Sequence, residues 1–483
     1  MSTDSADLNA ARRAAELEFS ASETADVLVV GGGITGVGVA LDAASRGLSV
    51  TLIEAHDLAY GTSRFSSKLV HGGLRYLATG DVATARESAV ERHLLMTTIA
   101  PHLIRPLGQL LPFVPEVSLR QRGTGAIGMA LGDLLRMRAG TSRRTLPAPR
   151  PVTAQHARRL APGLVTRGLR GGMLSFDGQL VDDARLVATV ARTAAAHGAR
   201  ILTRVRARSL RADGASAEDA LTGSRLDLRA RSVINATGAW AGTLDEGITI
   251  RPSRGTHVVL DAADLGAPTV ALTIPHEGSI SRFVFALPQP DGRVIVGLTD
   301  EDAPGPVPDV AAPTETEIAF LLDNLNRVLE HPLGRDHVRG AFAGLRPLVD
   351  TGAASTADIS RRHLVTASEG GFVDVLGGKL TTYRRMAEDA VDLAISLRGL
   401  EVGASRTAGL RLVDRRVPTA SGPLVDGMPL SREDVVFAVR SEGAMTASDV
   451  LDRRTRVGLA DADRARCEPA VETVVAETLA ELA

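Results

Sequence analysis

Three glycines near the N-terminus restrict the fold of this chain more than any other feature. Gly31, Gly33 and Gly36 follow the apolar run DVLVV in a GxGxxG pattern, and a second apolar run, LSVTLIE, ends at Glu54. This spacing is typical of a strand, a tight turn, a helix and a second strand within about thirty residues. Glycines here allow the turn, the close approach of a pyrophosphate and the packing of the helix on the strand. We therefore predict a βαβ unit with a helix over 35–46.

The same unit predicts a bound dinucleotide. The N-terminus of the helix offers free N–H groups and a positive potential to a pyrophosphate. Glu54 can accept hydrogen bonds from ribose hydroxyls and would repel a ribose 2′-phosphate, so FAD or NAD is favoured over NADP. The alternative is a glycine-rich turn with only a structural role.

Later segments favour FAD over NAD because they have the character of further cofactor contacts. NATGAW, at 235–240, follows a predicted strand and forms a small-residue turn that lets backbone approach a cofactor. GGKLTT, at 377–382, places two glycines and two hydroxyls at a helix start, which suits a flavin edge or an anion. Either segment alone could be an ordinary turn or helix cap. The segment 61–77, GTSRFSSKLVHGGLRYL, gathers hydroxyl, basic and aromatic side chains around a Gly-Gly pair.

The rest of the chain alternates between helical and strand patterns. Residues 184–198 are helical in pattern, and strands are expected over 199–210 and 226–235. The alternation over 251–299 indicates an antiparallel sheet, and the helical stretch 314–329 is expected to cover it.

Composition excludes several classes of protein. With 483 residues, 44% hydrophobic and 23% charged, the chain has room for two or three domains and matches a globular enzyme. It contains no apolar run long enough to span a bilayer and no signal-peptide core, so we expect a cytoplasmic location. A net charge of -2 argues against a nucleic-acid binder. The single cysteine, Cys467, leaves no thiolate metal cluster and no intramolecular disulfide, and no metal is expected.

Arginine is the usual cation of this chain. Of the 55 basic residues only Lys68 and Lys379 are lysines, and both lie in the glycine-containing segments. Residues 120–150 contain seven arginines and one acid around the apolar stretch AIGMALGDLL, which is too short to cross a bilayer. This pattern suits an anionic membrane face, and the alternative is an internal helix with solvated arginines.

Several longer motifs resemble those of one enzyme family. GTSRFSSKLVHGGLRYL, LSFDGQLVDDARL, RPSRGTHVVL, GAFAGLRPLV and GGKLTTYRRMAEDAVD occur in this order. In order and spacing they resemble the FAD-dependent, quinone-linked glycerol-3-phosphate dehydrogenases, which are flavoproteins of the D-amino-acid-oxidase type. The resemblance runs from about residue 25 to residue 392 and resumes at REDVVFAVRSEG and DVLDRRTRVGL.

The resemblance implies an α/β fold in which a glutathione-reductase-like, Rossmann-type FAD-binding domain is interleaved with an antiparallel-sheet substrate domain and followed by a small C-terminal helical domain. The expected division is a polar N-terminal segment (1–24), three parts of the FAD-binding domain (25–80, 161–240 and 341–398), a helical segment with membrane contact (81–160), the substrate domain (241–340) and the C-terminal domain (399–483).

The implied activity is oxidation of sn-glycerol 3-phosphate to dihydroxyacetone phosphate by hydride transfer to FAD, with electrons passed to the quinone pool. The alternatives are a glycerol-3-phosphate oxidase that uses oxygen, an amine or amino-acid oxidase of the same fold, and a non-enzymatic FAD-binding protein. The implied setting is a homo-oligomer, expected to be a dimer, held peripherally on the anionic inner face of the cytoplasmic membrane, without nucleic acid.

The resemblance also assigns site residues. His257 is the implied general base, with a satisfied strand histidine as the alternative, and Arg346 is implied to hold substrate oxygen and to stabilise developing charge. Arg75, Tyr76 and Lys379 are the implied phosphate cradle, and His71 is expected beside the flavin. The cofactor contacts are expected at Gly31, Gly33, Ile34, Thr35, Gly36, Glu54, Thr62, Ser63, Ser67, Lys68, His71, Gly72, Gly73, Val205, Ala236, Thr237, Gly238, Gly378, Lys379, Leu380 and Thr381.

Overall fold

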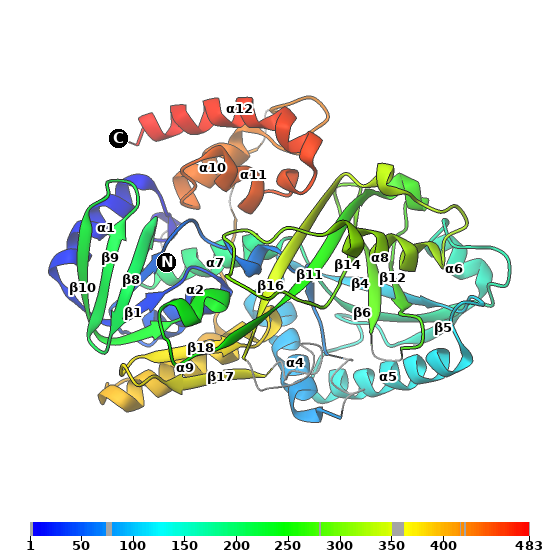
Figure 1. The fold of residues 1–483 in the computed structure, drawn as a ribbon, viewed down its shortest axis with the longest axis horizontal. Coiled ribbons are helices and arrows are strands. Elements are labelled where there is room, and N and C mark those ends of the chain that lie inside the picture. The colour runs from blue at the N-terminus through cyan, green and yellow to red at the C-terminus, as the bar shows by residue number, and fades with distance from the viewer. Residues whose placement is uncertain are drawn as a thin grey trace.

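Two β-sheets, the helices that cover them and a C-terminal group of helices make up the molecule (Figure 1). The computed structural model describes residues 3–73, 80–279, 282–349, 362–415, 417–419 and 422–482. The sheets are interleaved along the chain, because the sequence crosses between them several times. The predicted α/β fold with an interleaved antiparallel sheet and a helical C-terminal domain is confirmed.

The first sheet contains the predicted βαβ unit. Its main path has the order β17-β18-β10-β1-β2-β7, and β1 pairs in parallel with both β2 and β10. An antiparallel ribbon of β8 and β9 continues from β10. The strands are β1 (Thr24–Val30), β2 (Val50–Glu54), β7 (Arg200–Thr203), β8 (Val205–Arg211), β9 (Gly214–Asp219), β10 (Arg225–Asn235), β17 (His363–Ala367) and β18 (Val373–Gly377).

The second sheet is mostly antiparallel and has the order β15-β11-β14-β13-β12-β4-β6-β3, with β16 beside β11 and β5 beside β6. Its strands are β3 (Leu69–Val70), β4 (Ile104–Pro112), β5 (Arg150–Val152), β6 (Gly172–Leu180), β11 (Ile250–Asp261), β12 (Ala271–Pro275), β13 (Phe283–Pro288), β14 (Arg293–Gly297), β15 (Glu301–Asp302) and β16 (Gly340–Val349).

The α-helices begin and end close to the predicted positions where the sequence carried a clear pattern. They are α1 (Ala10–Ser22), α2 (Ile34–Ser45), α4 (Val82–Leu94), α5 (Leu119–Arg138), α6 (Ala154–Leu160), α7 (Asp183–Ala196), α8 (Glu315–Asn326), α9 (Tyr383–Arg398), α10 (Arg432–Ser441), α11 (Ala447–Arg453) and α12 (Asp461–Ala480). Short 3-10 turns at η2 (Thr62–Arg64), η4 (Gly238–Thr243) and η8 (Leu380–Thr382) begin within the glycine-containing segments.

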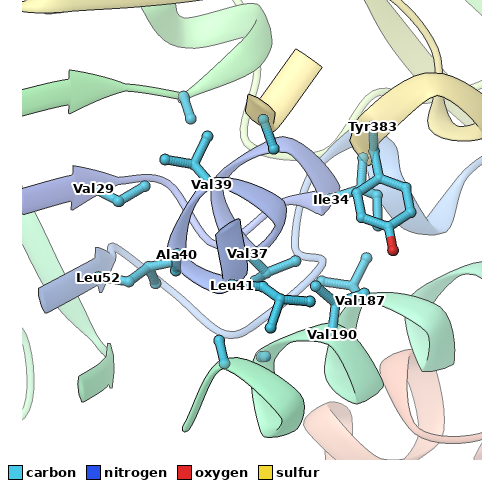
Figure 2. Close-up of a cluster of buried hydrophobic side chains, with 14 of the residues drawn as sticks. Val29, Ile34, Val37, Val39, Ala40, Leu41, Leu52, Val187, Val190 and Tyr383 are labelled. Carbon is cyan, nitrogen blue, oxygen red and sulfur yellow. The ribbon is translucent and has the colours of Figure 1, made fainter. Parts of the chain in front are cut away.

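Helix α2 is buried on nearly every side, since β1, β2, α7 and α9 enclose it, and most of its side chains are correspondingly apolar. Figure 2 shows its valines and leucine between Val29 of β1, Leu52 of β2, Val187 of α7 and Tyr383 of α9. A Cβ at Gly38 would lie 2.8 Å from the ring of Tyr383, so only glycine lets α9 pack this closely. Each fully buried valine or leucine here stabilises the fold by roughly 1.5–3 kcal/mol. The dinucleotide turn is therefore held on a rigid base.

Two segments contain elements that the sequence analysis did not predict. The polar N-terminal segment contains α1, whose Arg13 is buried and pairs with Asp219 at 2.5 Å. The segment 81–160, expected to be helical, contains β4 in its middle, and all nine residues of β4 pair with β6. The strand was missed because its stability comes from pairing with residues about seventy positions away, as the register of Gln109 with Ser175 shows.

The C-terminal helices α10, α11 and α12 have an apolar core of their own, which includes Val450, Val474 and the buried Cys467. They lie together above the two sheets in Figure 1. In the part of the chain that the structure describes, none of the helices combines the length and apolar character that crossing a membrane requires.

Candidate active site

A cavity of about 850 Å³ lies between the carboxyl ends of the parallel strands and one face of the second sheet. The first sheet contributes residues at or after its strand ends, such as Glu54 after β2 and Ala236 after β10. The second sheet contributes His257 from β11 and Arg346 from β16. Ligands of open α/β sheets bind at these carboxyl ends.

The glycine turn has the shape that a pyrophosphate requires. Gly31 has a φ of +113°, and a Cβ there would lie 2.6 Å from the carbonyl oxygen of Ala236. A Cβ at Gly36 would lie 1.8 Å from the carbonyl oxygen of Gly31, so this glycine permits the packing of α2 on the turn. Ser63 Oγ accepts a hydrogen bond from the N–H of Ile34 at 2.9 Å, at the start of α2. These residues fit the diphosphate of a dinucleotide such as FAD.

Glu54 stands where a ribose would bind. Its carboxylate accepts hydrogen bonds from the N–H groups of Gly32 at 2.6 Å and of His56 at 2.8 Å. Desolvation raises the pKa of Glu54, and these two donors oppose that shift. The acid is thus held at the cavity wall by backbone groups and faces the position of the ribose hydroxyls.

Most of the expected cofactor residues come together in this cavity. Those that line it are Gly31, Gly33, Ile34, Thr35, Glu54, Thr62, Ser63, Ser67, His71, Val205, Ala236, Thr237, Gly238, Gly378, Lys379, Leu380 and Thr381. Among the described residues, Gly36, Lys68, Gly72 and Gly73 are not part of the lining. Arg75 and Tyr76 lie outside the described residues.

Lys68 has a different place from the one expected. Its side chain is 1% exposed, and its Nζ donates to Asp183 Oδ1 at 2.6 Å and to the carbonyl oxygen of Arg64 at 2.9 Å. Because Asp183 begins α7, the ammonium ties the loop before β3 to that helix. The side chain is engaged in this pairing and is not part of the cavity lining, so the structure gives no support to the predicted contact of Lys68 with the cofactor.

His257 lies in the polar part of the cavity. Its Nε2 is 2.8 Å from Ser67 Oγ, and its ring stacks on Phe342 with centroids 4.8 Å apart. Burial, followed by the nearby charges of Lys68 and Arg346, lowers the pKa of His257 to about 3. The imidazole is therefore neutral at physiological pH.

Arg346 is fixed by three neighbours. Its Nη1 donates to Asp300 Oδ1 at 2.7 Å and to Ser253 Oγ at 3.2 Å, and its Nη2 donates to the carbonyl oxygen of Thr299 at 3.1 Å. A Cβ at Gly255 would lie 2.5 Å from Nη2, so that glycine leaves room for the guanidinium. The charge of Arg346 is thus held in one orientation at the cavity wall.

The GGKLTT segment forms a further wall. Gly378 has a φ of +71°, and a Cβ there would lie 2.4 Å from the sulfur of Met386. Lys379 caps the turn η8, and Thr381 Oγ1 accepts a hydrogen bond from the N–H of His71 at 3.4 Å. Two segments about 310 residues apart in sequence therefore meet beside the cavity.

Sequence reasoning missed a second part of the cavity, which we call the distal arm. It is bounded by strands β4, β12 and β13 and by α5, and its lining is formed by Leu111, Thr124, Gly125, Gly128, Met129, Thr273, Phe283 and Phe285, with Gln109, His276 and Arg282 as polar neighbours. The alternating pattern of FVFAL gave a signal for a strand but none for what its inner face would meet. Tyr60 and Trp240 also line the cavity; Trp240 belongs to the NATGAW segment that was predicted to contact the cofactor, but neither residue was assigned as a contact individually.

Comparisons with known proteins point the same way. A family model described as FAD dependent oxidoreductase matches residues 26–384, and one described as C-terminal domain of alpha-glycerophosphate oxidase matches residues 407–482. Glycerol-3-phosphate dehydrogenase 1 of Mycobacterium tuberculosis is 50% identical to this chain, and the alignment covers 96% of this chain and 97% of that protein.

Two solved structures share the fold. The glycerol-3-phosphate dehydrogenase of Bacillus halodurans complexed with FAD has a TM-score of 0.73 at 24% identity, covering 98% of this chain and 94% of that one. The L-alpha-glycerophosphate oxidase of Mycoplasma pneumoniae with FAD bound has a TM-score of 0.59 at 18% identity, covering 81% and 100%. The fold and the site define an FAD-dependent oxidoreductase. Within that class, the chain belongs to the FAD-dependent glycerol-3-phosphate dehydrogenase and oxidase family.

Proposed function

We propose that this chain oxidises sn-glycerol 3-phosphate to dihydroxyacetone phosphate and passes the electrons to a quinone. The observation that carries the proposal is one cavity in which the dinucleotide turn, the imidazole of His257 and the guanidinium of Arg346 meet. The substrate is supported by the name of a relative that is 50% identical over 96% of this chain.

His257 is the proposed proton acceptor. FAD, when bound, supplies the acceptor for the hydride that leaves the secondary carbinol carbon. The neutral imidazole can take the proton of the alcohol at Nε2, the nitrogen that contacts Ser67 Oγ before substrate binds, because Nδ1 is buried. Burial is the main cause of the low pKa of His257; an anionic phosphate in the cavity offsets the smaller contribution of Lys68 and Arg346, so substrate binding makes the imidazole a stronger base.

Cationic groups are the proposed partners of the substrate oxygens. Arg346, held by Asp300, can stabilise the charge that develops on the alcohol oxygen. Lys379 is the proposed partner of the phosphate, together with Arg75 and Tyr76 as the sequence motifs suggest. An amine or amino-acid substrate would not require this cationic set.

The distal arm supports a quinone as electron acceptor. His257 pairs with Gly297, Gly297 with Phe285, and Phe285 with Thr273, so one row crosses four strands of the second sheet. Residues in such a row point to the same face of a sheet. The row ends near Leu111, against which Gly125 of α5 packs. The arm thus extends from His257 to α5 with a mainly apolar lining, which suits a lipid-soluble ring.

The outer face of α5 supports peripheral attachment to a membrane. Its exposed apolar side chains are Leu119, Ile127, Leu131, Leu134 and Met137. Exposed arginines lie near both ends of this face, at Arg120, Arg138, Arg143 and Arg144. Arg136 has another place: it is buried, pairs with Asp133 at 2.5 Å and donates to the carbonyl oxygen of Thr141. Apolar side chains flanked by arginines favour an anionic lipid surface.

Anaerobic mixing of the holoenzyme with glycerol 3-phosphate tests the proposal. Loss of the visible absorbance of FAD is the expected result, and glycine serves as the control substrate that leaves the absorbance unchanged. Reoxidation is then followed with a short-chain quinone and, separately, with air. Reoxidation by air at the rate of the quinone would identify an oxidase, and absence of bleaching by glycerol 3-phosphate would refute the substrate.

A further inference from the structure

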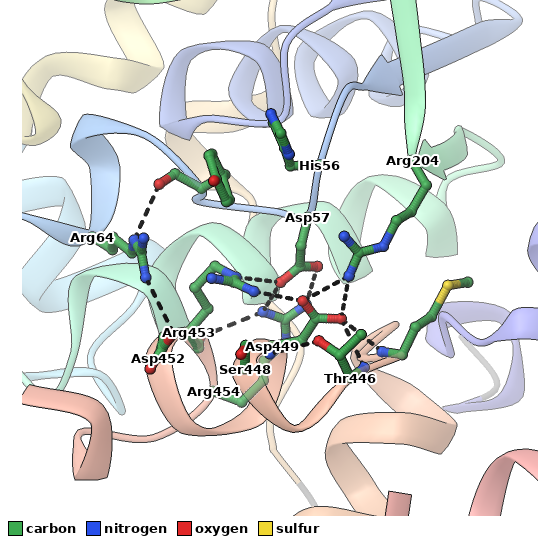
Figure 3. Close-up of polar contacts among 12 residues, drawn as sticks. His56, Asp57, Arg64, Arg204, Thr446, Ser448, Asp449, Asp452, Arg453 and Arg454 are labelled. Carbon is green, nitrogen blue, oxygen red and sulfur yellow. Dashed lines mark hydrogen bonds and ion pairs between the residues drawn. The ribbon is translucent and has the colours of Figure 1, made fainter. Parts of the chain in front are cut away.

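A buried cluster of charged side chains joins the C-terminal domain to the loop that follows β2 (Figure 3). We call residues 55–64 the flavin loop. Asp57 of this loop is 1% exposed, and Arg453 Nε donates to its Oδ2 at 2.7 Å. Arg454 donates to both carboxylate oxygens, at 3.0 and 2.8 Å. Both oxygens of Asp57 are therefore held by arginines at the end of α11.

A second carboxylate extends the cluster. Asp449 accepts hydrogen bonds from Arg204 at 2.8 and 2.7 Å and from Arg453, so Arg453 bridges Asp57 and Asp449. Burial alone would raise the pKa of Asp449, but Arg453 and Arg204 hold it at about 2. The carboxylate thus stays charged and paired across the working pH range.

Arg204 connects the cluster to a second wall of the cavity. It lies in the turn between β7 and β8, and its N–H donates to the carbonyl oxygen of His56 at 2.8 Å. The next residue, Val205, lines the cavity. Helix α11 therefore binds both the flavin loop, which follows β2, and the turn that follows the neighbouring parallel strand β7.

The other face of the flavin loop lines the cavity. His56, Tyr60, Thr62 and Ser63 all contribute to the lining, and the rings of His56 and Tyr60 stack with centroids 3.9 Å apart. The N–H of His56 also binds the carboxylate of Glu54. A shift of Asp57 therefore displaces residues on the adenosine side of the cofactor site.

We propose that Asp57 is a positioning residue for FAD, and that through Arg453 and Arg454 the C-terminal domain holds the flavin loop in its binding conformation. Removing one partner of a buried ion pair leaves the other charge without compensation, which forces the loop or the helix to move. Because the cavity lies directly on the other side of the loop, the cofactor is then held less firmly.

The chain offers a matched control for a merely structural role. Glu442 is as buried as Asp57, at 1%, and its carboxylate binds Arg185 of α7 at the same domain boundary. Among the described residues, neither Glu442 nor Arg185 belongs to the cavity lining. Glu442→Gln therefore removes the charge that pairs with Arg185 but keeps the main-chain carbonyl of residue 442, which accepts hydrogen bonds from Arg454, so the contacts of Asp57 remain in place.

The test is the rate of FAD release from the holoenzyme. Wild-type protein, Asp57→Asn, Arg453→Gln and Glu442→Gln are diluted, and the rise in flavin fluorescence is followed beside the melting temperature of each protein. We expect Asp57→Asn and Arg453→Gln to release FAD about tenfold faster or more, and Glu442→Gln to remain within about twofold of wild type at a comparable loss of melting temperature.

The double variant Asp57→Asn with Arg453→Gln shows whether the two side chains affect FAD release through their contact with each other. We expect its release rate to rise by less than the product of the two single effects, because both changes remove the Asp57–Arg453 contact, whereas only the first removes the contact with Arg454 and only the second that with Asp449. Release rates that follow melting temperature across all variants would overturn the proposal, as would a wild-type rate in Arg453→Gln. Since Arg453 lies outside the flavin loop, that variant answers the question even if Asp57→Asn does not fold.

Discussion

Ser67 Oγ and His257 Nε2 lie 2.8 Å apart in the cavity, although 190 residues separate them in the sequence. Ser67 lies in the loop before β3, and His257 is on β11 in the same sheet. Their contact fixes the plane of a neutral imidazole that also stacks on Phe342. The side chain proposed to accept the substrate proton is therefore oriented before substrate arrives.

Replacing His257 by glutamine tests the proposed base. Glutamine can still hydrogen-bond to Ser67 but cannot take up a proton, so we expect the rate of flavin bleaching to fall by about 10²- to 10⁴-fold. FAD content should remain that of wild type. Rapid-mixing absorbance under anaerobic conditions measures the rate, with Ser67→Ala as the comparison that keeps the imidazole and removes its hydrogen bond; FAD content is measured for this variant too, because Ser67 lines the cavity. Bleaching at the wild-type rate in His257→Gln would assign the proton to another group.

Lys379→Arg tests the proposed phosphate contact. A lysine ammonium is a compact point charge, whereas the guanidinium is a wide planar fork that needs more room in a turn packed against Met386. We expect the variant to keep FAD and to lose about tenfold or more in kcat/KM, equal to about 1.4 kcal/mol of transition-state stabilisation.

Lys379→Ala should lose more, because the phosphate would lack a close cation. Steady-state kinetics with glycerol 3-phosphate and the flavin-to-protein ratio are measured together for both variants. Wild-type kinetics in Lys379→Arg would refute the phosphate contact, and loss of flavin would make Lys379 chiefly a cofactor residue.

Asp374 makes stability depend on pH. It lies on β18, fully buried, and accepts a hydrogen bond from Asn235, whose Oδ1 in turn accepts one from Thr237 in the cofactor turn. Burial, and to a smaller extent Asp245, raise the pKa of Asp374 to about 7, while the hydrogen bond from Asn235 lowers it. The unfolded chain releases this proton near the ordinary pKa of about 3.9.

The folded protein therefore keeps a proton that the unfolded chain loses between about pH 4 and about pH 7. The contribution of the protonated Asp374 to the stability of the folded protein is fully present below its pKa in the unfolded chain, about 3.9, and is lost as pH rises through its pKa in the folded protein, about 7. We expect Asp374→Asn, which mimics the protonated acid, to be more stable than wild type by a larger margin at about pH 8 than at about pH 5, because the wild-type contribution is only partly lost at about pH 5. Urea unfolding at both pH values measures this, and an equal difference at the two values would contradict it.

The α5 face is tested with anionic lipid vesicles. Replacing Leu119, Ile127 and Leu131 by serine removes exposed apolar surface without opening the core, so we expect vesicle binding to fall while melting temperature is unchanged. Leu221→Ser, at another exposed leucine, is the control. Replacing Arg138, Arg143 and Arg144 by glutamine should reduce the part of the binding that high salt also removes. Co-sedimentation that is unaffected by both sets would exclude this face.

The sequence alone determined the parts of this protein that depend on short-range geometry. The spacing of Gly31, Gly33 and Gly36 specifies a tight turn and a helix start, and α2 begins at Ile34, one residue from the predicted start. Glu54 ends β2 as predicted, because the order of strand, turn, helix and strand is specified within one continuous stretch of about thirty residues. Local patterns also located α7, α8 and α9.

Only the tertiary structure decided which distant side chains meet. Lys68 appeared in a cofactor motif, yet its ammonium pairs with Asp183, 115 residues away. The local sequence pattern around Asp57 did not predict its contact with Arg453, which lies 396 residues further along the chain. Such contacts depend on sheet register and domain docking, which are set by the packing of the whole chain, whereas the glycine turn is set by backbone sterics within a few residues.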